Sequence, residues 1–249
     1  MPRLMFQRPR RIEWEELTPR FGRMAAEPFE KGYALTVGNS LRRVLLSVIP
    51  GAAIAWARIP GVGAASQQVP GVQEPLVEVL LNVKKVVVGL TGDQPATARL
   101  ESRGPATVTA SELSGPGVEV LNPEAVICSV EAAGRLTLEL GVRIGRGYVS
   151  ADRHPEPAPS GAIAIDAAFS PIQRVNYTVE MSRLGKITDY EKLVVEIWTN
   201  GTIAPDQAFL RASKLLRDHF DLFTPAGADE DDDELPADPA VPGEAATSS

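Results

Sequence analysis

The 249-residue sequence is poor in the residues that most often build catalytic and metal-binding sites. It contains one cysteine, Cys128, which excludes an internal disulfide, fits a reducing compartment and is expected to be a buried structural thiol. Its two histidines, His154 and His219, lie far apart in the chain. The sequence therefore presents neither a set of zinc ligands nor an evident Ser-His-Asp triad.

Long apolar runs are also missing. No stretch of about eighteen apolar residues occurs, so we expect no transmembrane helix. Residues 1–13 are basic and mixed, without the apolar segment and small-residue cleavage site of a signal peptide. We therefore expect a cytoplasmic protein that does not associate with membranes.

The basic surface expected of a protein that binds duplex DNA is absent as well. The formal net charge is −7, but residues 224–249 hold eight acidic residues and no lysine or arginine, so the remainder of the chain carries +1. Such a tail of Asp, Glu, Pro and Ala cannot bury a core, and we predict that it is a disordered, solvated linker. The nearly neutral body offers no broad positive field for DNA.

The rest of the chain divides into three regions that together predict an α+β fold. Residues up to about 49 indicate a strand or two followed by a helix. Residues 50–172 are rich in Val, Thr, Gly and Pro, and indicate mostly strands and turns. Residues 173–223 indicate two strands and a long helix.

The first helix is predicted between Thr36, as its N-cap, and Pro50-Gly51, which ends it. One core-facing stripe of this helix contains Val37, Leu41, Val44, Leu45 and Val48. Gly38 is unexpected within it, because glycine costs about 1 kcal/mol relative to alanine in a helix. We interpret Gly38 as a point where another backbone approaches closely.

This helix also carries apolar residues outside that stripe. Leu46 and Ile49 lie beside Arg42, and Arg43 is close to Leu46 on the helical wheel. A single sheet cannot cover such a helix, so a second surface, such as another subunit, is expected. An arginine next to an exposed leucine is typical of a protein interface, although a solvated face is the commoner role of such a pair.

The second long helix is predicted to begin at Pro205, with Asp206 complementing the helix dipole. Five residues along it are spaced three and four apart, like the a and d positions of a coiled coil: Phe209, Ala212, Leu216, His219 and Phe223. This pattern fits packing against a partner, and it fits equally an ordinary amphipathic helix folded on its own sheet.

In the middle region we predict a half-buried strand over residues 136–144, a shorter strand over 118–120 and one continuous strand over 162–169. Residues 74–88 indicate a helix followed by a strand. The glycines of residues 141–147 are interpreted as a turn or bulge after a strand, because no helix follows to form a phosphate cradle.

Several of these segments resemble the family of bacterial DNA-directed RNA polymerase alpha subunits. The resemblance begins with KGYALTVGNSLRRVLLSVIPG over residues 31–51 and continues with PGVQE at 70–74, LLNVK at 80–84, VIC at 126–128 and RGYV at 146–149. It ends with SPIQRVNY at 170–177, DYEKLVVE at 189–196 and TNGTI at 199–203. The matches follow the family's order from about residue 28 to 223.

The resemblance implies a discontinuous dimerisation domain, residues 10–50 and 173–223, made of a sheet and two main helices. A β-rich assembly domain, residues 51–172, is inserted into it, and residues 224–249 form the acidic linker. The implied function is that of a non-catalytic subunit that homodimerises and scaffolds the beta and beta-prime subunits for transcription. The active site of this nucleotidyltransferase complex, with its magnesium, would lie in beta-prime, and this chain would bind no cofactor.

The resemblance also implies two sets of contact residues. The subunit-contact set is Arg42, Arg43, Leu46, Lys84, Ser170 and Arg174. The dimerisation set, which combines the resemblance with the helical patterns, is Leu41, Leu45, Phe209, Ala212, Leu216, Phe220 and Phe223. Which surface contacts beta and which contacts beta-prime in each copy stays open.

Two departures from the family pattern are present. Residues 61–66 replace a more polar segment of the family, so any contact made there is open. The family usually continues past an acidic linker into a small domain that binds promoter DNA, and whether that domain follows in the native protein is open; we expect no direct DNA binding from this segment.

Two other functions stay open on the sequence alone. One is a free-standing hydrolase that uses His154, and the other is a generic homodimeric β-rich interaction module. Activity that survives His154→Ala would remove the first.

Overall fold

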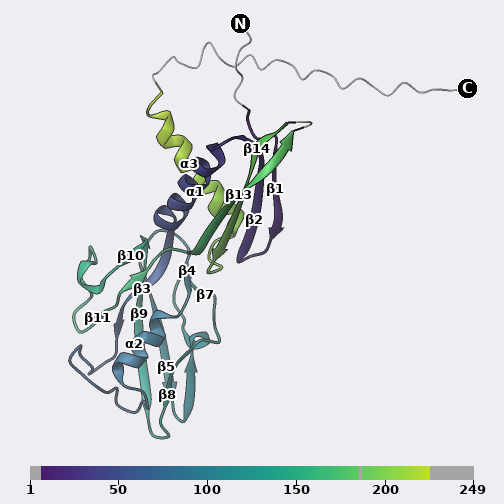
Figure 1. The fold of residues 1–249 in the computed structure, drawn as a ribbon. Coiled ribbons are helices and arrows are strands. Elements are labelled where there is room, and N and C mark those ends of the chain that lie inside the picture. Colours follow the sequence, from purple (N-terminus) through teal and green to yellow (C-terminus); the bar gives the residue numbers. More distant parts are fainter. Residues whose placement is uncertain (1–6, 185–186, 225–249) are drawn as a thin grey trace, which may run out of the picture.

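The structure, a computed structural model, describes residues 7–184 and 187–224. It has two parts, seen one above the other in Figure 1. The upper part, here called the helix-covered sheet, combines the two ends of the described chain. The lower part, here called the β-rich part, is built from the residues between them. Each part has its own hydrophobic core, one formed within residues 24–49 and 172–212 and one formed within residues 54–165.

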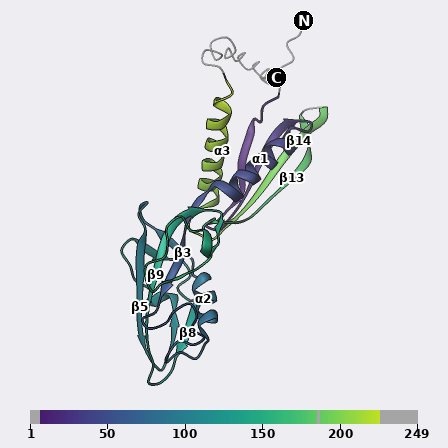
Figure 2. The ribbon, with the colours of Figure 1, turned by 90° about the vertical axis from the view of Figure 1, so that its left-hand side faces the viewer.

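The helix-covered sheet contains four antiparallel strands in the order β1-β2-β14-β13. Their bounds are β1 Arg11–Leu17, β2 Phe21–Glu30, β13 Ile172–Leu184 and β14 Ile187–Thr199. The central pairing joins segments about 170 residues apart, with Ala25 opposite Val194. Two helices, α1 (Tyr33–Val48) and α3 (Pro205–Asp221), lie on one side of this sheet (Figure 2).

The β-rich part is centred on a second antiparallel sheet in the order β11-β3-β9-β5. The strands of this sheet are β3 Pro50–Arg58, β5 Ala96–Arg103, β9 Arg135–Arg146 and β11 Ile163–Ala164. Smaller pairs surround it, formed by β4 Val88–Leu90 with β7 Val118–Val120, β6 Ala106–Thr109 with β8 Val126–Val130, and β10 Tyr148–Val149 with β12 Ala167–Ala168. The helix α2 spans Leu76–Lys84, and two 3-10 turns span Ala110–Glu112 and Ala151–Arg153.

Most of the predicted elements are confirmed. Residues 74–88 form α2 and then the start of β4, residues 118–120 form β7, and the long helix begins at Pro205. In β9 the period-two pattern is reproduced, because Leu136, Leu138 and Leu140 are all buried. The α+β fold class is confirmed as well.

The predicted start of the first helix is wrong. α1 begins at Tyr33, so Thr36 lies within its first turn and does not cap it. The residue before the helix is Gly32, which adopts a left-handed conformation with φ of 82° that glycine tolerates at no steric cost. Its backbone N–H donates to Glu191 Oε1 at 2.8 Å, so a residue distant in sequence holds the backbone immediately before the helix.

In the middle region one prediction is wrong, and another holds only in part. Residues 162–169 form two short strands in different sheets, since β11 pairs with β3 and β12 pairs with β10. The turn predicted within residues 141–147 is confined to Gly147, whose φ is 61°, because β9 continues through Gly141 and Gly145 as far as Arg146. Because neither glycine of the strand has a side chain, an aromatic ring packs directly on the strand backbone at each position, Trp56 at Gly141 and Phe169 at Gly145.

Candidate functional site

An apolar groove lies between α1, α3 and the covered face of the upper sheet. Its volume is about 360 Å³, and it is lined by Leu41 on α1, by Phe209, Leu216 and Phe220 on α3, and by apolar side chains of β1, β2 and β14. Trp14 on β1 meets Phe209 edge-on, with ring centroids 5.9 Å apart. Four of the predicted dimerisation residues therefore line one continuous surface.

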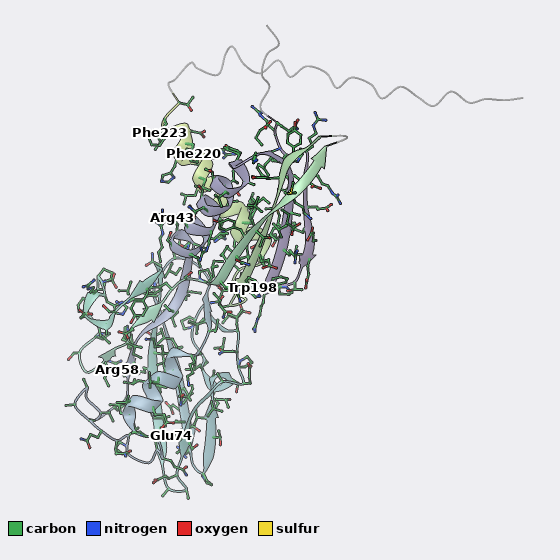
Figure 3. All side chains as sticks on the ribbon, viewed as in Figure 1. Arg43, Arg58, Glu74, Trp198, Phe220 and Phe223 are labelled. Atoms are coloured by element: carbon green, nitrogen blue, oxygen red, sulfur yellow. The ribbon has the colours of Figure 1, made fainter. Side chains whose placement is uncertain are left out.

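The last turn of α3 and the turn that follows it expose apolar side chains. Phe220 is 62% exposed and Phe223 is 84% exposed, and Figure 3 shows both at the free end of this helix. Two phenylalanines in water are unfavourable, since burying such a side chain contributes roughly 1.5–3 kcal/mol. Among residues 7–184 and 187–224, this end of α3 is thus apolar surface that no other segment covers.

Three residues of the predicted dimerisation set lie inside the chain's own core. Leu45 and Ala212 are fully buried, and Leu41 is nearly so. Leu45 and Ala212 belong to the core cluster under α1 and α3, so they hold the two helices to their own sheet. Coiled-coil spacing alone could not separate these residues from those that face outward.

A second groove, here called the junction groove, lies where the helix-covered sheet meets the β-rich part. Its volume is about 560 Å³, and its lining includes Leu46, Lys84 and Ser170. The three come from the last turn of α1, the end of α2 and the segment before β13. They meet because β3 follows α1 directly and β13 returns the chain to the upper sheet. Half of the predicted subunit-contact set is therefore gathered in one place.

Lys84 is held in the junction groove by a polar cluster. Its ammonium donates to Asp166 Oδ2 at 3.1 Å and lies 5.5 Å from the centre of the Tyr148 ring. Asp166 also accepts the Ala151 backbone N–H at 2.9 Å and the Tyr148 hydroxyl. These hydrogen bonds, that from Ala151 first, lower the pKa of Asp166 to about 2. The hydrogen bond between the Tyr148 hydroxyl and Asp166 also raises the pKa of Tyr148, because donation to a carboxylate stabilises the protonated phenol.

The three predicted arginines lie outside the junction groove. Arg42 and Arg43 are exposed on α1, and neither forms an ion pair with a carboxylate of the described residues. Figure 3 shows Arg43 projecting away from the sheet. Arg174 is exposed on β13, where its guanidinium carbon lies 4.8 Å from the centre of the Trp198 ring.

The sequence patterns missed Asp166, Tyr148 and Trp198. Asp166 and Tyr148 stand in short irregular segments that carry no periodic signal. A periodic signal was available for Trp198, because it alternates with the buried Leu193, Val195 and Ile197 and therefore lies on the other face of β14, beside Glu196.

The isolated histidine and the cysteine have structural contacts. His154 Nε2 lies 2.8 Å from the carbonyl oxygen of Ile165, and its ring meets Phe169 edge-on, so it anchors the loop of residues 154–161, which contains three prolines. The expected burial of Cys128 is confirmed. Within the described ranges, no group of three or more His, Cys, Asp or Glu side chains is arranged to hold a metal ion. No helix in those ranges is long and apolar enough to cross a membrane.

Comparison with known proteins places these features in a family. Residues 27–220 match the family model of the RNA polymerase Rpb3/Rpb11 dimerisation domain. The chain is 48% identical over 222 residues to the DNA-directed RNA polymerase subunit alpha of Moorella thermoacetica, a match that covers 88% of this chain and 71% of the relative. It is 44% identical to the subunit alpha of Carboxydothermus hydrogenoformans, with the same coverage. For Symbiobacterium thermophilum the subunit alpha is 44% identical over 217 residues, 86% of this chain and 69% of the relative. The chain therefore belongs to the family of DNA-directed RNA polymerase alpha subunits and carries the family's dimerisation domain.

Proposed function

We propose that this chain is a non-catalytic scaffold that homodimerises and then binds the beta and beta-prime subunits of a DNA-directed RNA polymerase. The observation that carries the proposal is the apolar groove between α1 and α3, together with the uncovered end of α3. Contiguous apolar surface of this kind on a soluble protein marks an interaction site. The match to a dimerisation domain over residues 27–220 supports a second copy as the occupant.

The two parts of the molecule are assigned separate tasks. Residues 10–50 and 173–223 form the dimerisation domain, and residues 51–172 form the inserted assembly domain. The presence of two separate hydrophobic cores supports this division, because each part can then keep its shape while its outer surface binds a partner. The acidic residues 225–249 lie outside the described residues.

In the dimer, the same surface of each copy faces the other. A twofold arrangement is self-complementary. The exposed end of α3 in one copy therefore packs against the groove of the second copy, and the end of α3 in the second copy packs in the same way against the groove of the first. Phe220 and Phe223 are then buried by the partner, together with the groove-lining faces of Phe209 and Leu216. Leu45 and Ala212 contribute indirectly, by holding α1 and α3 in place.

The junction groove and the neighbouring arginines form the surface for the large subunits. Leu46 supplies an exposed apolar side chain, Lys84 supplies a charge, and Arg43 lies one turn before Leu46 on the same helix. Arginine is among the residue types that contribute most of the binding energy at protein interfaces. The two copies of the dimer each present this surface, so beta and beta-prime can each occupy one.

Nucleotidyl transfer and its magnesium are assigned to beta-prime, with no cofactor in this chain and no direct DNA contact from this segment. This assignment rests on the family relationship and on the sparse chemistry of the chain, with one cysteine and two histidines. The complex is expected to work in the cytoplasm.

The test combines mass measurement with one substitution. Sedimentation equilibrium at micromolar concentration should give twice the mass of one chain, and the dimer should co-purify with the large subunits. Arg43→Ala should weaken the binding of beta by about tenfold or more, as expected for an interfacial arginine, without changing the dimer mass or the unfolding midpoint. The control is Arg99→Ala, because Arg99 is exposed on β5 and paired with Glu101 within the chain.

Two results would contradict the proposal. A mass of one chain at micromolar concentration would remove homodimerisation. Loss of the folded dimer in the Arg43→Ala variant would show that this arginine supports the fold or the dimer and not the recruitment of a large subunit.

A further inference from the structure

The face of the upper sheet opposite α1 and α3 carries a cross-strand row of two aromatic rings and an arginine. Trp198 on β14 lies directly opposite Phe21 on β2 and Arg174 on β13 in the strand register. The Phe21 and Trp198 ring centroids are 5.0 Å apart, and the Arg174 guanidinium carbon is 4.8 Å from the centre of the Trp198 ring. Figure 3 shows Trp198 at the end of the sheet nearest the β-rich part.

Arg174 differs from the other arginines of this face. Arg23 is paired with Glu15 at 2.9 Å and with Glu196 at 3.4 Å. Glu196 also accepts the Asn176 side-chain amide, so the carboxylate nearest in the register is already engaged. Within the part of the chain that the structure describes, Arg174 has no carboxylate within 4.0 Å and no hydrogen-bond acceptor.

Stacking leaves the hydrogen-bonding groups of an arginine free. A guanidinium that lies over an indole uses its flat face for the contact, while its N–H groups point outward in the plane. Those N–H groups form the fork that binds a carboxylate with two parallel hydrogen bonds. A stacked side chain also has fewer rotamers to lose when a partner binds, so the complex forms at a lower entropic cost.

This row of side chains adjoins the junction groove. Gln173, which immediately precedes Arg174, and Asn200, which lies two residues after Trp198, both line that groove. A large subunit seated in the groove would therefore extend naturally onto the sheet surface around Trp198. This continuity identifies the partner that could bring a carboxylate to Arg174.

We propose that Trp198 is a positioning residue, whose indole ring holds the Arg174 guanidinium ready to bind a carboxylate of the large subunit seated in the junction groove. The inference rests on the proposed function, and it adds a residue that acts through Arg174 without being the contact itself. Phe21 supports the indole from the other side and completes the row.

The experiment is a double-mutant cycle on the intact dimer, with affinities for purified beta and beta-prime measured by titration. Arg174→Ala should lower the affinity for one large subunit by about tenfold. Trp198→Leu, which keeps an apolar side chain and removes the aromatic face, should lower it several-fold. Trp198→Phe should retain most of the affinity, because it keeps an aromatic face under the guanidinium. The double variant Trp198→Leu with Arg174→Ala should bind no more weakly than Arg174→Ala alone.

Controls separate positioning from a structural effect. The dimer mass and the urea midpoint of each variant should stay close to those of the wild type. Arg23→Ala removes an arginine that is already paired on the same face, and it should leave the affinity unchanged. An equal loss in Arg23→Ala would overturn the inference, because it would reduce the effect to a general loss of positive charge.

Other outcomes also decide the question. Additive losses for Trp198→Leu and Arg174→Ala would show that the indole does not act through the arginine. If Arg174→Ala has no effect while Arg43→Ala weakens binding, the inference fails and the proposed function stands. If neither arginine matters, the proposed contact surface itself is wrong.

Discussion

Gly38 lies in the middle of α1, where the helix packs against its sheet, and its replacement by alanine sets two effects of opposite sign against each other. Alanine is favoured over glycine by about 1 kcal/mol in a helix interior. A Cβ at this position would lie 2.8 Å from Tyr177 Cδ2 and 2.9 Å from Leu193 Cδ1, closer than carbon atoms normally approach. Close approach was expected here from the sequence, but it comes from side chains of the sheet and not from another backbone.

The packing effect should win. Inserting a methyl group into a tightly packed core costs roughly 1–3 kcal/mol, and Leu193 is almost fully buried, so it has little room to move. Subtracting the gain in helix propensity leaves a net loss of up to about 2 kcal/mol. For a protein of this size that loss lowers Tm by up to about 8 °C.

The measurement is thermal unfolding at one fixed protein concentration, because dimerisation makes Tm depend on concentration. The matched control is Asn39→Ala at the next, exposed position of α1, which should gain a few tenths of a kcal/mol from propensity alone. Combining Gly38→Ala with Leu193→Val should cost less than the sum of the two changes, since the second makes room for the first. A rise in Tm for Gly38→Ala, matching that of the control, would refute the reasoning.

Two further predictions follow from the titrating groups. Burial, aided by the charges of Glu74 and Glu112, raises the pKa of Cys128 to about 12. At pH 8 a thiol reagent should therefore react with Cys128 only when the protein unfolds. Rapid labelling of the native protein without denaturant would contradict this prediction. The hydrogen bonds to Asp166 lower its pKa to about 2, so its ionised form stabilises the fold. This stabilisation is complete above the ordinary aspartate pKa near 4, and it is lost as the pH falls through about 2. Asp166→Asn should lower the free energy of unfolding by less than about 1 kcal/mol at pH 7, because both side chains of the Lys84–Asp166 pair are about one-third exposed. The difference in urea midpoint between variant and wild type should shrink toward pH 2. A difference that stays constant with pH would show that Asp166 acts through its shape alone.

The elements with strong local signals were predictable. Alternating residues in β9, the proline at the start of α3 and the apolar stripe of α1 all report side-chain spacing within a few residues of each other. The errors occur where a distant segment supplies the deciding contact. Glu191 bonds the backbone at the start of α1, and Phe169 fills the space left by Gly145, so neither the true helix start nor the continuation of β9 past residue 144 was visible locally.

The contact residues divide in the same way. The family resemblance and the helical patterns together placed Leu45, Ala212, Phe220 and Phe223 in one predicted dimerisation set. The structure separates them, because α1 and α3 share one face of the sheet and cover Leu45 and Ala212, while α3 extends past the sheet and leaves Phe220 and Phe223 exposed.

By itself the sequence determined which segments become helices and strands, which family the chain resembles, and that reactive residues are scarce in it. These properties depend on residue type and on spacing along the chain. Only the tertiary structure decided that Leu46, Lys84 and Ser170 share one groove and that Trp198 supports Arg174. Such surfaces depend on pairings such as that of β2 with β14, which join residues about 170 positions apart, and a local pattern carries no information about contacts at that range.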